Sequence, residues 1–282
     1  MKNKTKQIAI VSGASGFIAS HLIKSLKEQE IVVIPLPRKL LYEPYTGLQE
    51  FLTKHNPDYI YALHSYGNLF SQQEEDKIVM ANYFATWNLL QASKYINYKA
   101  FIHFATSKHS QDSNTFYGAT KKGAQALAFA HAKQYDKPIV SVEPYTVIGI
   151  SEPREHLIPT IIQSCLIGDE MPFVSDPSHD YIGAYDFINA LQLIVDNIRI
   201  TNGKSYEIGT GKTYTNGDIL NMVEQLTNKH ANIRKIKLMR EYDSQDWRAD
   251  VKPLRALGWA QEQHIQMVIK EMIEYEKKAY QG

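Results

Sequence analysis

The 282-residue sequence predicts an α/β fold with a doubly wound parallel sheet and a smaller C-terminal α/β lobe. Short apolar runs alternate with helical patterns as far as about residue 150, which is typical of a parallel sheet with helices on both faces. The first of these runs leads directly into a glycine turn and a helix. From residue 151 proline, glycine and polar residues become more frequent. We therefore expect one domain over 1–150 and a smaller lobe over 151–282, with some chain returning to the core.

The composition excludes several classes of protein. The net charge is +1, so no bulk field favours nucleic acid or an anionic membrane. No apolar run approaches the ~20 residues of a membrane span, and we see no signal peptide. The single Cys165 excludes an internal disulfide framework and a cysteine zinc site, and the scattered histidines give little support to any metal site. We expect a cytoplasmic protein that holds no metal and binds neither nucleic acid nor membrane.

The N-terminal stretch combines a strand, a glycine turn and a helix. Residues 7–12 form an apolar run, and a helical apolar pattern covers 20–28. Between them, Gly13 permits a tight turn and Gly16 lets backbone N–H groups approach a pyrophosphate at the helix N-terminus. This context favours dinucleotide binding over a glycine turn without a ligand. The expected contacts come from the turn and the start of the helix: Gly13, Ser15, Gly16, Phe17 and Ile18.

The second expected strand, residues 31–36, ends without the acidic residue that would bond an adenosine ribose and favour NAD. Arg38 and Lys39 follow Pro37 instead. Two cations at this point suit a 2′-phosphate, so we expect NADP as the cofactor, with NAD as the alternative. An ordinary solvated Arg-Lys pair is the competing interpretation.

The third expected strand, residues 57–63, should bring its last residues to the cofactor. Ligands gather at the carboxyl ends of parallel strands, so Leu63 and His64 are expected there. A hydrogen-bonded structural histidine is an equally good interpretation of His64. A long helix over 78–94 then leads to a buried strand over 101–104.

The stretch after residue 104 carries the residues with the clearest chemistry. Ser107 follows the strand, and Tyr117 and Lys121 lie at the start of an alanine-rich run with high helix propensity. On a helix, residues four apart share a face, and an ammonium beside a phenol stabilises the phenolate. A strand-end hydroxyl would bond the oxygen of a reacting carbonyl. This set predicts a proton-transfer site for alcohol–ketone chemistry, although the Tyr-x-x-x-Lys spacing alone is weak and recurs at Tyr95 and Lys99.

The remaining elements follow the same reasoning. A short helix is expected over 48–55 and a strand over 139–143, which ends in the loop 144–149. The second half should contain helices over 158–166, 184–197, 219–227 (capped by residues 216–218) and 263–278, and short strands over 172–174 and 205–208.

The order of these motifs resembles the extended short-chain dehydrogenase/reductases, specifically the NAD(P)-dependent epimerase/dehydratase group that acts on nucleotide sugars. The likeness covers nearly the whole chain and implies a Rossmann domain. It rests on Gly13-x-x-Gly16-x-x-Ala19, Asn82-x-x-x-Thr86, Phe104-Ala-Thr-Ser107, Tyr117-x-x-x-Lys121, Pro144 to Gly149, and His179-Asp180 to Asp186.

The resemblance implies a role for each matching residue. Ser107 takes the catalytic hydroxyl position with Thr106 as a fallback, and Tyr117 and Lys121 form the catalytic pair. Cofactor contacts extend to Leu63, His64, Asn82, Tyr117, Lys121, Pro144 and Val147, and substrate contacts are expected from Thr106, His179 and Arg240. The chain departs from the group at three places: His64-Ser65 stands where two small residues are usual, and Glu143 and His179 stand where arginines are usual.

Within this group, the short chain and Arg38 look like the 4-keto-6-deoxy nucleotide-sugar reductases of surface-polysaccharide pathways. A reductase uses free NADPH in each turnover, whereas an epimerase keeps NAD bound. We rank reductase first, epimerase second and dehydratase third. A non-catalytic NADP-sensing regulator is the alternative of another class. The resemblance also implies a homodimer formed through the helices that contain Asn82 and Tyr117.

Overall fold

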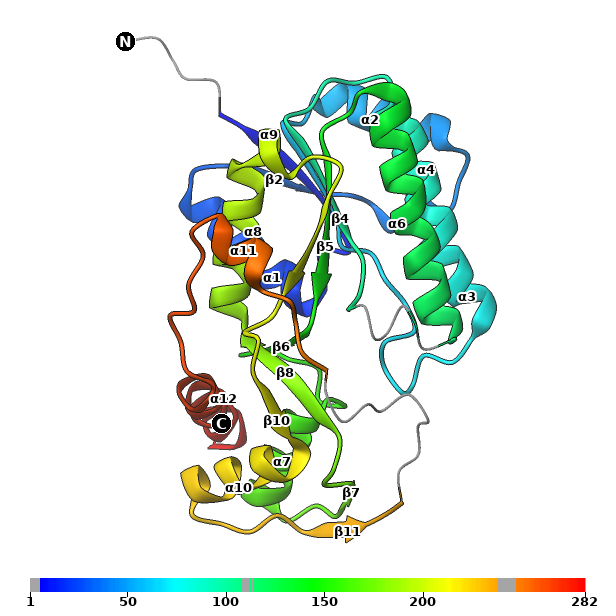
Figure 1. Ribbon diagram of the computed structural model, residues 1–282. Coiled ribbons are helices and arrows are strands. Elements are labelled where there is room, and N and C mark those ends of the chain that lie inside the picture. The colour runs from blue at the N-terminus through cyan, green and yellow to red at the C-terminus, as the bar shows by residue number, and fades with distance from the viewer. Residues whose placement is uncertain (1–5, 108–111, 113, 238–246, 282) are drawn as a thin grey trace. The chain divides into compact units, whose positions relative to one another are not determined.

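A computed structural model describes residues 6–107, 112, 114–237 and 247–281 (Figure 1). The chain divides into two compact units. The first contains Met1–Pro144 and Ala190–Tyr206, and the second contains Tyr145–Asn189 and Glu207–Gly282. Within the described ranges, none of the helices combines the length and apolar character needed to cross a bilayer.

A six-stranded sheet forms the centre of the fold. Its neighbouring pairs from β2 through β5 are parallel. The chain moves from β1 outward to β2 and then returns to place β3 on the other side of β1, so the order reverses between β1 and β3. Ligands of doubly wound sheets bind at such a switch point, and the predicted fold class is confirmed. In order across the sheet, the strands are β2 (Val32–Pro35), β1 (Ile8–Ser12), β3 (Tyr59–Ala62), β4 (Ala100–Phe104), β5 (Ile139–Pro144) and β9 (Ser205–Ile208).

Helices cover both faces of this sheet. In Figure 1, α2, α4 and α6 lie on one face and α1 lies on the other. The core beneath the first three joins strand residues such as Ile60 and Phe101 to helix residues such as Leu52 and Leu89, all without exposed surface. On the opposite face, Gln192 of α8 donates to Ser25 of α1 at 2.7 Å. These helices are α1 (Phe17–Glu28), α2 (Tyr45–His55), α4 (Ala85–Ser93), α6 (Phe116–Tyr135) and α8 (Ala184–Asp196).

The helix expected over 78–94 is present but not uniform. It consists of α3 (Glu75–Val79), a π-helical turn η2 (Met80–Phe84) and α4. Single π turns inside helices occur often at functional sites, and this one contains the buried Asn82. A short 3₁₀ turn, η1 (Arg38–Leu41), follows β2.

The helix α6 begins where its capping residue dictates. The Thr115 hydroxyl accepts a hydrogen bond from the Gly118 N–H at 3.1 Å, which fixes Phe116 as the first helical residue. Tyr117 therefore lies in the first turn, where the helix leaves the strand-end side of the sheet, and Lys121 lies one turn later.

The second unit contains two small sheets. The three-stranded sheet has the order β10 (Thr213–Thr215), β8 (Ser178–Gly183), β6 (Thr146–Ile148), and the two-stranded sheet pairs β7 (Met171–Phe173) with β11 (Ile233–Lys235). The strands β6, β8, β10 and β11 and the short helices α9 (Ile198–Thr201) and α11 (Lys252–Ala256) are not among the expected elements, and β6 lies within the expected loop 144–149. Each is too short to give a clear apolar period, apart from β8, whose residues were interpreted as a motif instead.

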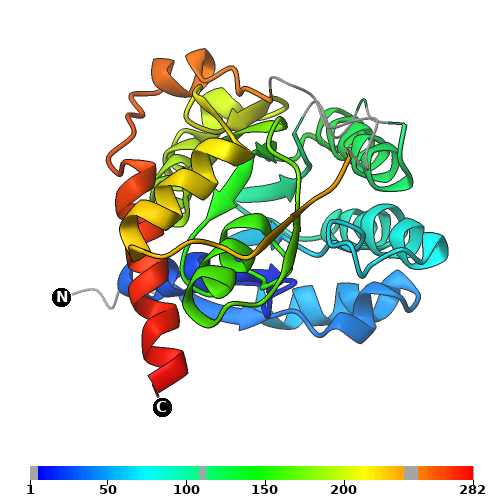
Figure 2. The ribbon, with the colours of Figure 1, turned by 90° about the horizontal axis from the view of Figure 1, so that it is seen from below.

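Three helices pack around these sheets: α7 (Leu157–Ile167), α10 (Asn216–Thr227) and α12 (Ile265–Gln281). Figure 2 shows α10 beside α12, and their shared core includes Ile161, Val223, Ile269 and the buried Cys165. The cap of α10 differs from the expected one. Thr215, not Asn216, is the N-cap, and it forms a capping box with Asp218.

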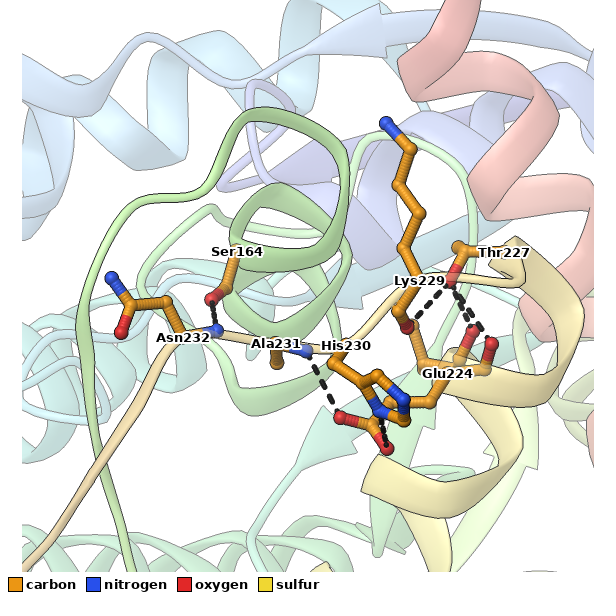
Figure 3. Close-up of polar contacts among 8 residues, drawn as sticks. Ser164, Glu224, Thr227, Lys229, His230, Ala231 and Asn232 are labelled. Atoms are coloured by element: carbon orange, nitrogen blue, oxygen red, sulfur yellow. Dashed lines mark hydrogen bonds and ion pairs between the residues drawn. The ribbon is translucent and has the colours of Figure 1, made fainter.

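Polar contacts fasten the chain after α10, as Figure 3 shows. The Glu224 carboxylate accepts the Ala231 N–H at 2.9 Å and contacts His230 Nδ1 at 3.1 Å. The Ser164 hydroxyl of α7 accepts the Asn232 N–H at 2.8 Å. These bonds direct the chain into β11 immediately afterwards.

Candidate active site

The glycine turn after β1 has the geometry that a pyrophosphate site needs. Gly13 has φ of +65°, and a Cβ placed there would lie 2.9 Å from the main-chain nitrogen of His64, so only glycine fits. The Gly16 N–H donates to the Gly13 carbonyl at 3.0 Å, and Gly16 is the N-cap of α1. Ser15 and Gly16 are exposed, and Phe17 and Ile18, half-buried, form the first turn of α1. This arrangement suits a bound anion.

His64 lies at the switch point between β1 and β3. Its Nδ1 contacts the Ser12 hydroxyl at 2.7 Å and its Nε2 contacts the Thr86 hydroxyl at 3.1 Å. Thr86 donates its own proton to the Asn82 carbonyl, so Nε2–H donates to Thr86 and Ser12 donates to Nδ1. Burial, together with the charge of Lys121, lowers the pKa of His64 to about 3. Both ring nitrogens are used within the chain, which favours the structural interpretation of this histidine.

The two cations after β2 have different surroundings. The exposed Lys39 pairs with Glu43 at 3.3 Å, one helical turn along. The Arg38 guanidinium is also exposed and lies over the Tyr42 ring, 5.8 Å from its centroid. Arg38 therefore holds its charge at the end of β2, where an adenosine ribose is expected, while Lys39 is already engaged by a carboxylate.

Tyr117 is the centre of the candidate catalytic group. The side chains of Thr106 and Ser65 lie close enough to its phenol to lower the pKa of Tyr117. Burial raises the pKa of Tyr117, while these two contacts act in the opposite direction. Thr106 comes from the end of β4 and Ser65 from the end of β3, so the carboxyl ends of two neighbouring strands supply hydroxyls to one phenol. The sequence reasoning missed Ser65 as a contact and noted it only as a departure from the family pattern.

Lys121 is buried and donates from Nζ to the Phe104 carbonyl, at the end of β4. Burial lowers the pKa of Lys121 to about 7. We expected Lys121 to lower the pKa of Tyr117. The structure corrects this expectation: burial raises the Tyr117 pKa, and the groups that lower it are Thr106 and Ser65. Because the pKa of Lys121 is about 7, its amine is already neutral at the higher pH where this phenol ionises, so it has no positive charge left to stabilise the phenolate.

Thr106 and Ser107 compete for the catalytic hydroxyl position. Both are buried, and Thr106 is in contact with the Tyr117 phenol. We predict that Thr106→Val, which removes the hydroxyl at nearly constant volume, lowers kcat by about 10²-fold, since it removes a donor to the reacting oxygen. Ser107→Ala should lower kcat by a smaller factor.

The measurement is steady-state kinetics of both variants alongside cofactor titration, which should give unchanged dissociation constants. A larger loss in Ser107→Ala than in Thr106→Val would return the catalytic role to Ser107.

Asn82 holds the loop after β3 against the catalytic helix. Its Oδ1 accepts the Tyr66 N–H at 2.9 Å, and its Nδ2 donates to the Tyr66 carbonyl at 2.9 Å and to the Thr120 hydroxyl at 3.2 Å. The amide is thus used inside the chain, next to Ser65 on one side and Lys121 on the other. Its expected contact with the cofactor stays a prediction, whereas its positioning of this loop is visible in the structure.

A buried polar network lies one turn beyond Lys121 on the same helix. Gln125 Nε2 donates to the Ser141 hydroxyl at 3.0 Å and to the Glu143 carboxylate at 2.8 Å. Ser141 also contacts His103 Nδ1 at 3.0 Å, and burial together with Lys121 and His64 lowers the pKa of His103. Glu143, which stands where relatives usually have arginine, therefore ties β5 to the catalytic helix. A single sequence gave no signal for this network.

The other predicted site residues are placed as follows. Leu63 is half-buried and its carbonyl faces Gly13, Pro144 ends β5, and Val147 lies buried in β6. His179 of β8 packs edge-on against Trp247, with ring centroids 4.8 Å apart. Its neighbour Asp180 accepts the N–H groups of Thr210, Gly211 and Ala249 and so joins three segments of the second unit. Arg240 lies outside the described residues, so its expected substrate contact stays a prediction.

Comparison with known proteins gives the family of this chain. The NAD dependent epimerase/dehydratase family matches residues 9–209. The chain is 26% identical over 318 residues to the trifunctional UDP-glucose 4,6-dehydratase/UDP-4-keto-6-deoxy-D-glucose 3,5-epimerase/UDP-4-keto-L-rhamnose-reductase RHM1 of Arabidopsis thaliana, covering 93% of this chain and 45% of that protein. It therefore spans about half the length of that relative.

Two further relatives match over almost their whole length. CDP-abequose synthase of Salmonella typhimurium is 25% identical, with 95% of this chain and 98% of that protein covered. The structure of UDP-glucuronic acid 4-epimerase from Bacillus cereus, in complex with UDP-glucuronic acid and NAD, has a TM-score of 0.86 at 21% identity and covers 97% of this chain and 100% of that one. With a family match that includes the glycine turn, Tyr117 and Lys121, the chain belongs to the NAD dependent epimerase/dehydratase family, an extended short-chain dehydrogenase/reductase as its motifs predicted.

Proposed function

We propose that this chain reduces the ketone of a 4-keto-6-deoxy nucleotide sugar with NADPH, in the biosynthesis of a surface-polysaccharide sugar. One observation carries the proposal: the Tyr117 phenol lies against Thr106 at the strand ends, with Lys121 one helical turn behind it. A phenol whose pKa is raised holds its proton at neutral pH. That is the state needed to protonate a ketone oxygen.

The residues present fit a dinucleotide. The exposed turn around Gly16 offers first-turn N–H groups of α1 to a pyrophosphate, and Gly13 leaves room for the close approach of the chain. Arg38 is the residue that we assign to a 2′-phosphate. The cofactor, when bound, supplies the hydride for the carbonyl carbon.

The chain's own groups would handle the proton. Thr106 bonds the substrate oxygen and the Tyr117 phenol, which fixes the direction in which the proton leaves. Tyr117 transfers its proton to the oxygen as the carbonyl is reduced. Lys121, with a pKa of about 7, is well matched to return a proton at neutral pH. The buried His64 and His103 stay neutral and hold the strand ends in place.

The names of relatives support the substrate class. The Arabidopsis relative is named for a dehydratase, an epimerase and a 4-keto-L-rhamnose reductase acting on UDP-sugars, and the Salmonella relative is named CDP-abequose synthase. The direct test incubates the protein with NADPH and a 4-keto-6-deoxy sugar nucleotide. Oxidation of NADPH with formation of a product two mass units heavier supports the proposal, and an unchanged sugar nucleotide contradicts it.

The cofactor preference tests the role of Arg38. We expect Arg38→Ala to weaken NADPH binding by roughly 10-fold or more and to leave NADH binding nearly unchanged, because only NADPH has the 2′-phosphate that the guanidinium would bond. Fluorescence titration with both cofactors measures this ratio. Lys39→Ala is the matched control, since its ammonium already pairs with Glu43. An equal loss for both cofactors would refute the assignment.

Nucleotide-sugar epimerisation is the second candidate. The Bacillus cereus structural relative is a 4-epimerase that holds NAD, and the two reactions need the same phenol. Tighter binding of NAD than of NADP, with no net oxidation of cofactor during turnover, would favour this candidate. A dehydratase ranks third, and a chain that binds NADP without turnover would be a regulator.

We also propose a homodimer. Met80, Phe84 and Trp87 repeat at helical spacing along η2 and α4, and all three are exposed. Phe116, at the start of α6, is exposed as well. An apolar stripe of this size suits a second copy of the chain. Sedimentation equilibrium would detect the dimer, and Trp87→Lys should weaken it.

A further inference from the structure

The segment after β2 leaves the sheet at the same edge as the glycine turn after β1. Pro35 of β2 pairs with Val11 of β1, and the Leu36 N–H donates to the Val11 carbonyl at 2.9 Å. The two strands are parallel, so both connections start from carboxyl ends, where ligands of such sheets bind. The glycine turn begins at Gly13 and the 3₁₀ turn η1 begins at Arg38. Arg38 therefore belongs to the same edge of the sheet as the expected pyrophosphate site.

The turn η1 is fixed to α4 by one side-chain amide. Asn88 of α4 donates from Nδ2 to the Leu41 carbonyl at 3.1 Å and to the Glu43 carbonyl at 3.3 Å. The Leu41 side chain is buried in the core beneath α2 and α4. Within the turn, the Tyr42 N–H donates to the Lys39 carbonyl at 3.1 Å. The main chain that carries Arg38 is thus held by the core, by Asn88 and by its own hydrogen bonds.

The Arg38 side chain is held by the other end of the same turn. Tyr42 is the C-cap of η1, and its ring centroid lies 5.8 Å from Arg38 Cζ, within the range of a cation–π attraction. Both side chains are exposed. An attraction to a ring face leaves guanidinium N–H donors available to a phosphate. The neighbouring Lys39 differs, because its ammonium pairs with the Glu43 carboxylate at 3.3 Å.

We propose that Tyr42 and Asn88 set the cofactor preference of this chain: Tyr42 holds the Arg38 guanidinium ready for a 2′-phosphate, and Asn88 holds the turn that carries both. Tyr42 is then a specificity-determining residue and Asn88 a positioning residue. The physical reason is preorganisation, since a guanidinium that is already in place loses less side-chain freedom when it binds. This inference rests on the proposed function, in which Arg38 bonds the 2′-phosphate of NADPH.

The first test compares NADPH and NADH binding by fluorescence titration and needs no sugar substrate. Tyr42→Leu should weaken NADPH binding by roughly 3-fold and leave NADH binding unchanged, because the ring that holds the guanidinium is lost. Tyr42→Phe is the matched control. It keeps the ring and should bind both cofactors like the wild type. Tyr42 lies at the surface, so neither substitution should prevent folding.

The second test separates positioning by Asn88 from a merely structural role. Asn88→Ala should weaken NADPH binding by roughly 3-fold with little change for NADH, because η1 loses two of its bonds. Asn88→Asp should have a larger effect, since its carboxylate would face two carbonyls that it cannot bond. A merely structural residue would lower the thermal midpoint and weaken both cofactors equally.

The Arg38→Ala background distinguishes this inference from the proposed function. In that background Tyr42→Leu should have no further effect on NADPH binding, because the ring acts through the guanidinium. A further loss there would overturn the inference. An NADPH-to-NADH affinity ratio unchanged in Tyr42→Leu or in Asn88→Ala, but lowered in Arg38→Ala, would also overturn it and would leave the assignment of Arg38 intact. A ratio unchanged in Arg38→Ala would remove the proposed 2′-phosphate site, and this inference with it.

Discussion

Replacing Tyr117 by Phe should lower turnover by at least about 10³-fold, since the variant loses the phenol that we propose as the proton donor, next to Thr106. The ring remains, so the loop around Gly67 keeps its packing and the fold should be retained. Cofactor binding should change by less than about 3-fold, because the glycine turn and Arg38 are untouched. Rapid-quench kinetics with NADPH and the keto sugar nucleotide measures the chemical step directly.

Tyr95→Phe is the matched control for this experiment. Tyr95 has the same spacing to a lysine, Lys99, and is exposed, with Lys94 near its ring. The control should keep the wild-type rate. A Tyr117→Phe variant with wild-type turnover would remove the basis of the catalytic account.

Replacing Lys121 by Met should have opposite effects on activity and stability. Turnover should fall by about 10²-fold, because the group that resupplies the proton is lost. Stability should rise, because a buried ammonium is desolvated and its removal relieves that penalty. We expect the free energy of unfolding at pH 7 to increase by about 2 kcal/mol, after allowing for the lost bond to the Phe104 carbonyl.

The pH dependence gives the sign of this effect. The folded-state pKa of Lys121, about 7, lies below its ordinary value of 10.5. Below the folded value the lysine is charged in both states and the full penalty applies. As pH rises from about 7 towards 10.5 the unfolded chain binds more protons than the folded chain, so wild-type stability rises. The advantage of Lys121→Met should therefore be largest at or below pH 7 and shrink towards pH 10.5. Urea unfolding over this range measures it, and a variant less stable than the wild type at pH 7 would contradict the buried-ammonium account.

The local features of the site could be predicted from the sequence. Gly13, Gly16 and the start of α1 follow from a strand, a turn and a helix within one short segment, and Tyr117 and Lys121 follow from helical spacing. The parallel sheet follows from the alternation of strands and helices. These inferences depend on neighbours in sequence, which a single chain reveals.

The contacts that set the pKa values of the site residues could not be predicted from the sequence. Lys121 bonds a carbonyl 17 residues away, and His64 bonds Ser12, which precedes it by 52 residues. No periodicity in the sequence connects residues that lie so far apart along the chain, so neither bond could be predicted. Ser65 was visible at the carboxyl end of a strand, but its contact with Tyr117 depends on the loop that Asn82 holds in place. We expected a lowered pKa for Tyr117, but burial raises it. Burial depends on the tertiary structure, which the local sequence pattern does not reveal.

The central claim is that this chain reduces a sugar ketone with a hydride from NADPH and a proton from Tyr117. The most direct measurement uses NADPH carrying deuterium at the transferable position, a 4-keto-6-deoxy sugar nucleotide and mass spectrometry of the product. We expect one deuterium at the former carbonyl carbon, one NADP formed for each sugar reduced, and no incorporation with Tyr117→Phe. A product that forms without deuterium and without consumption of NADPH would contradict the reductase account.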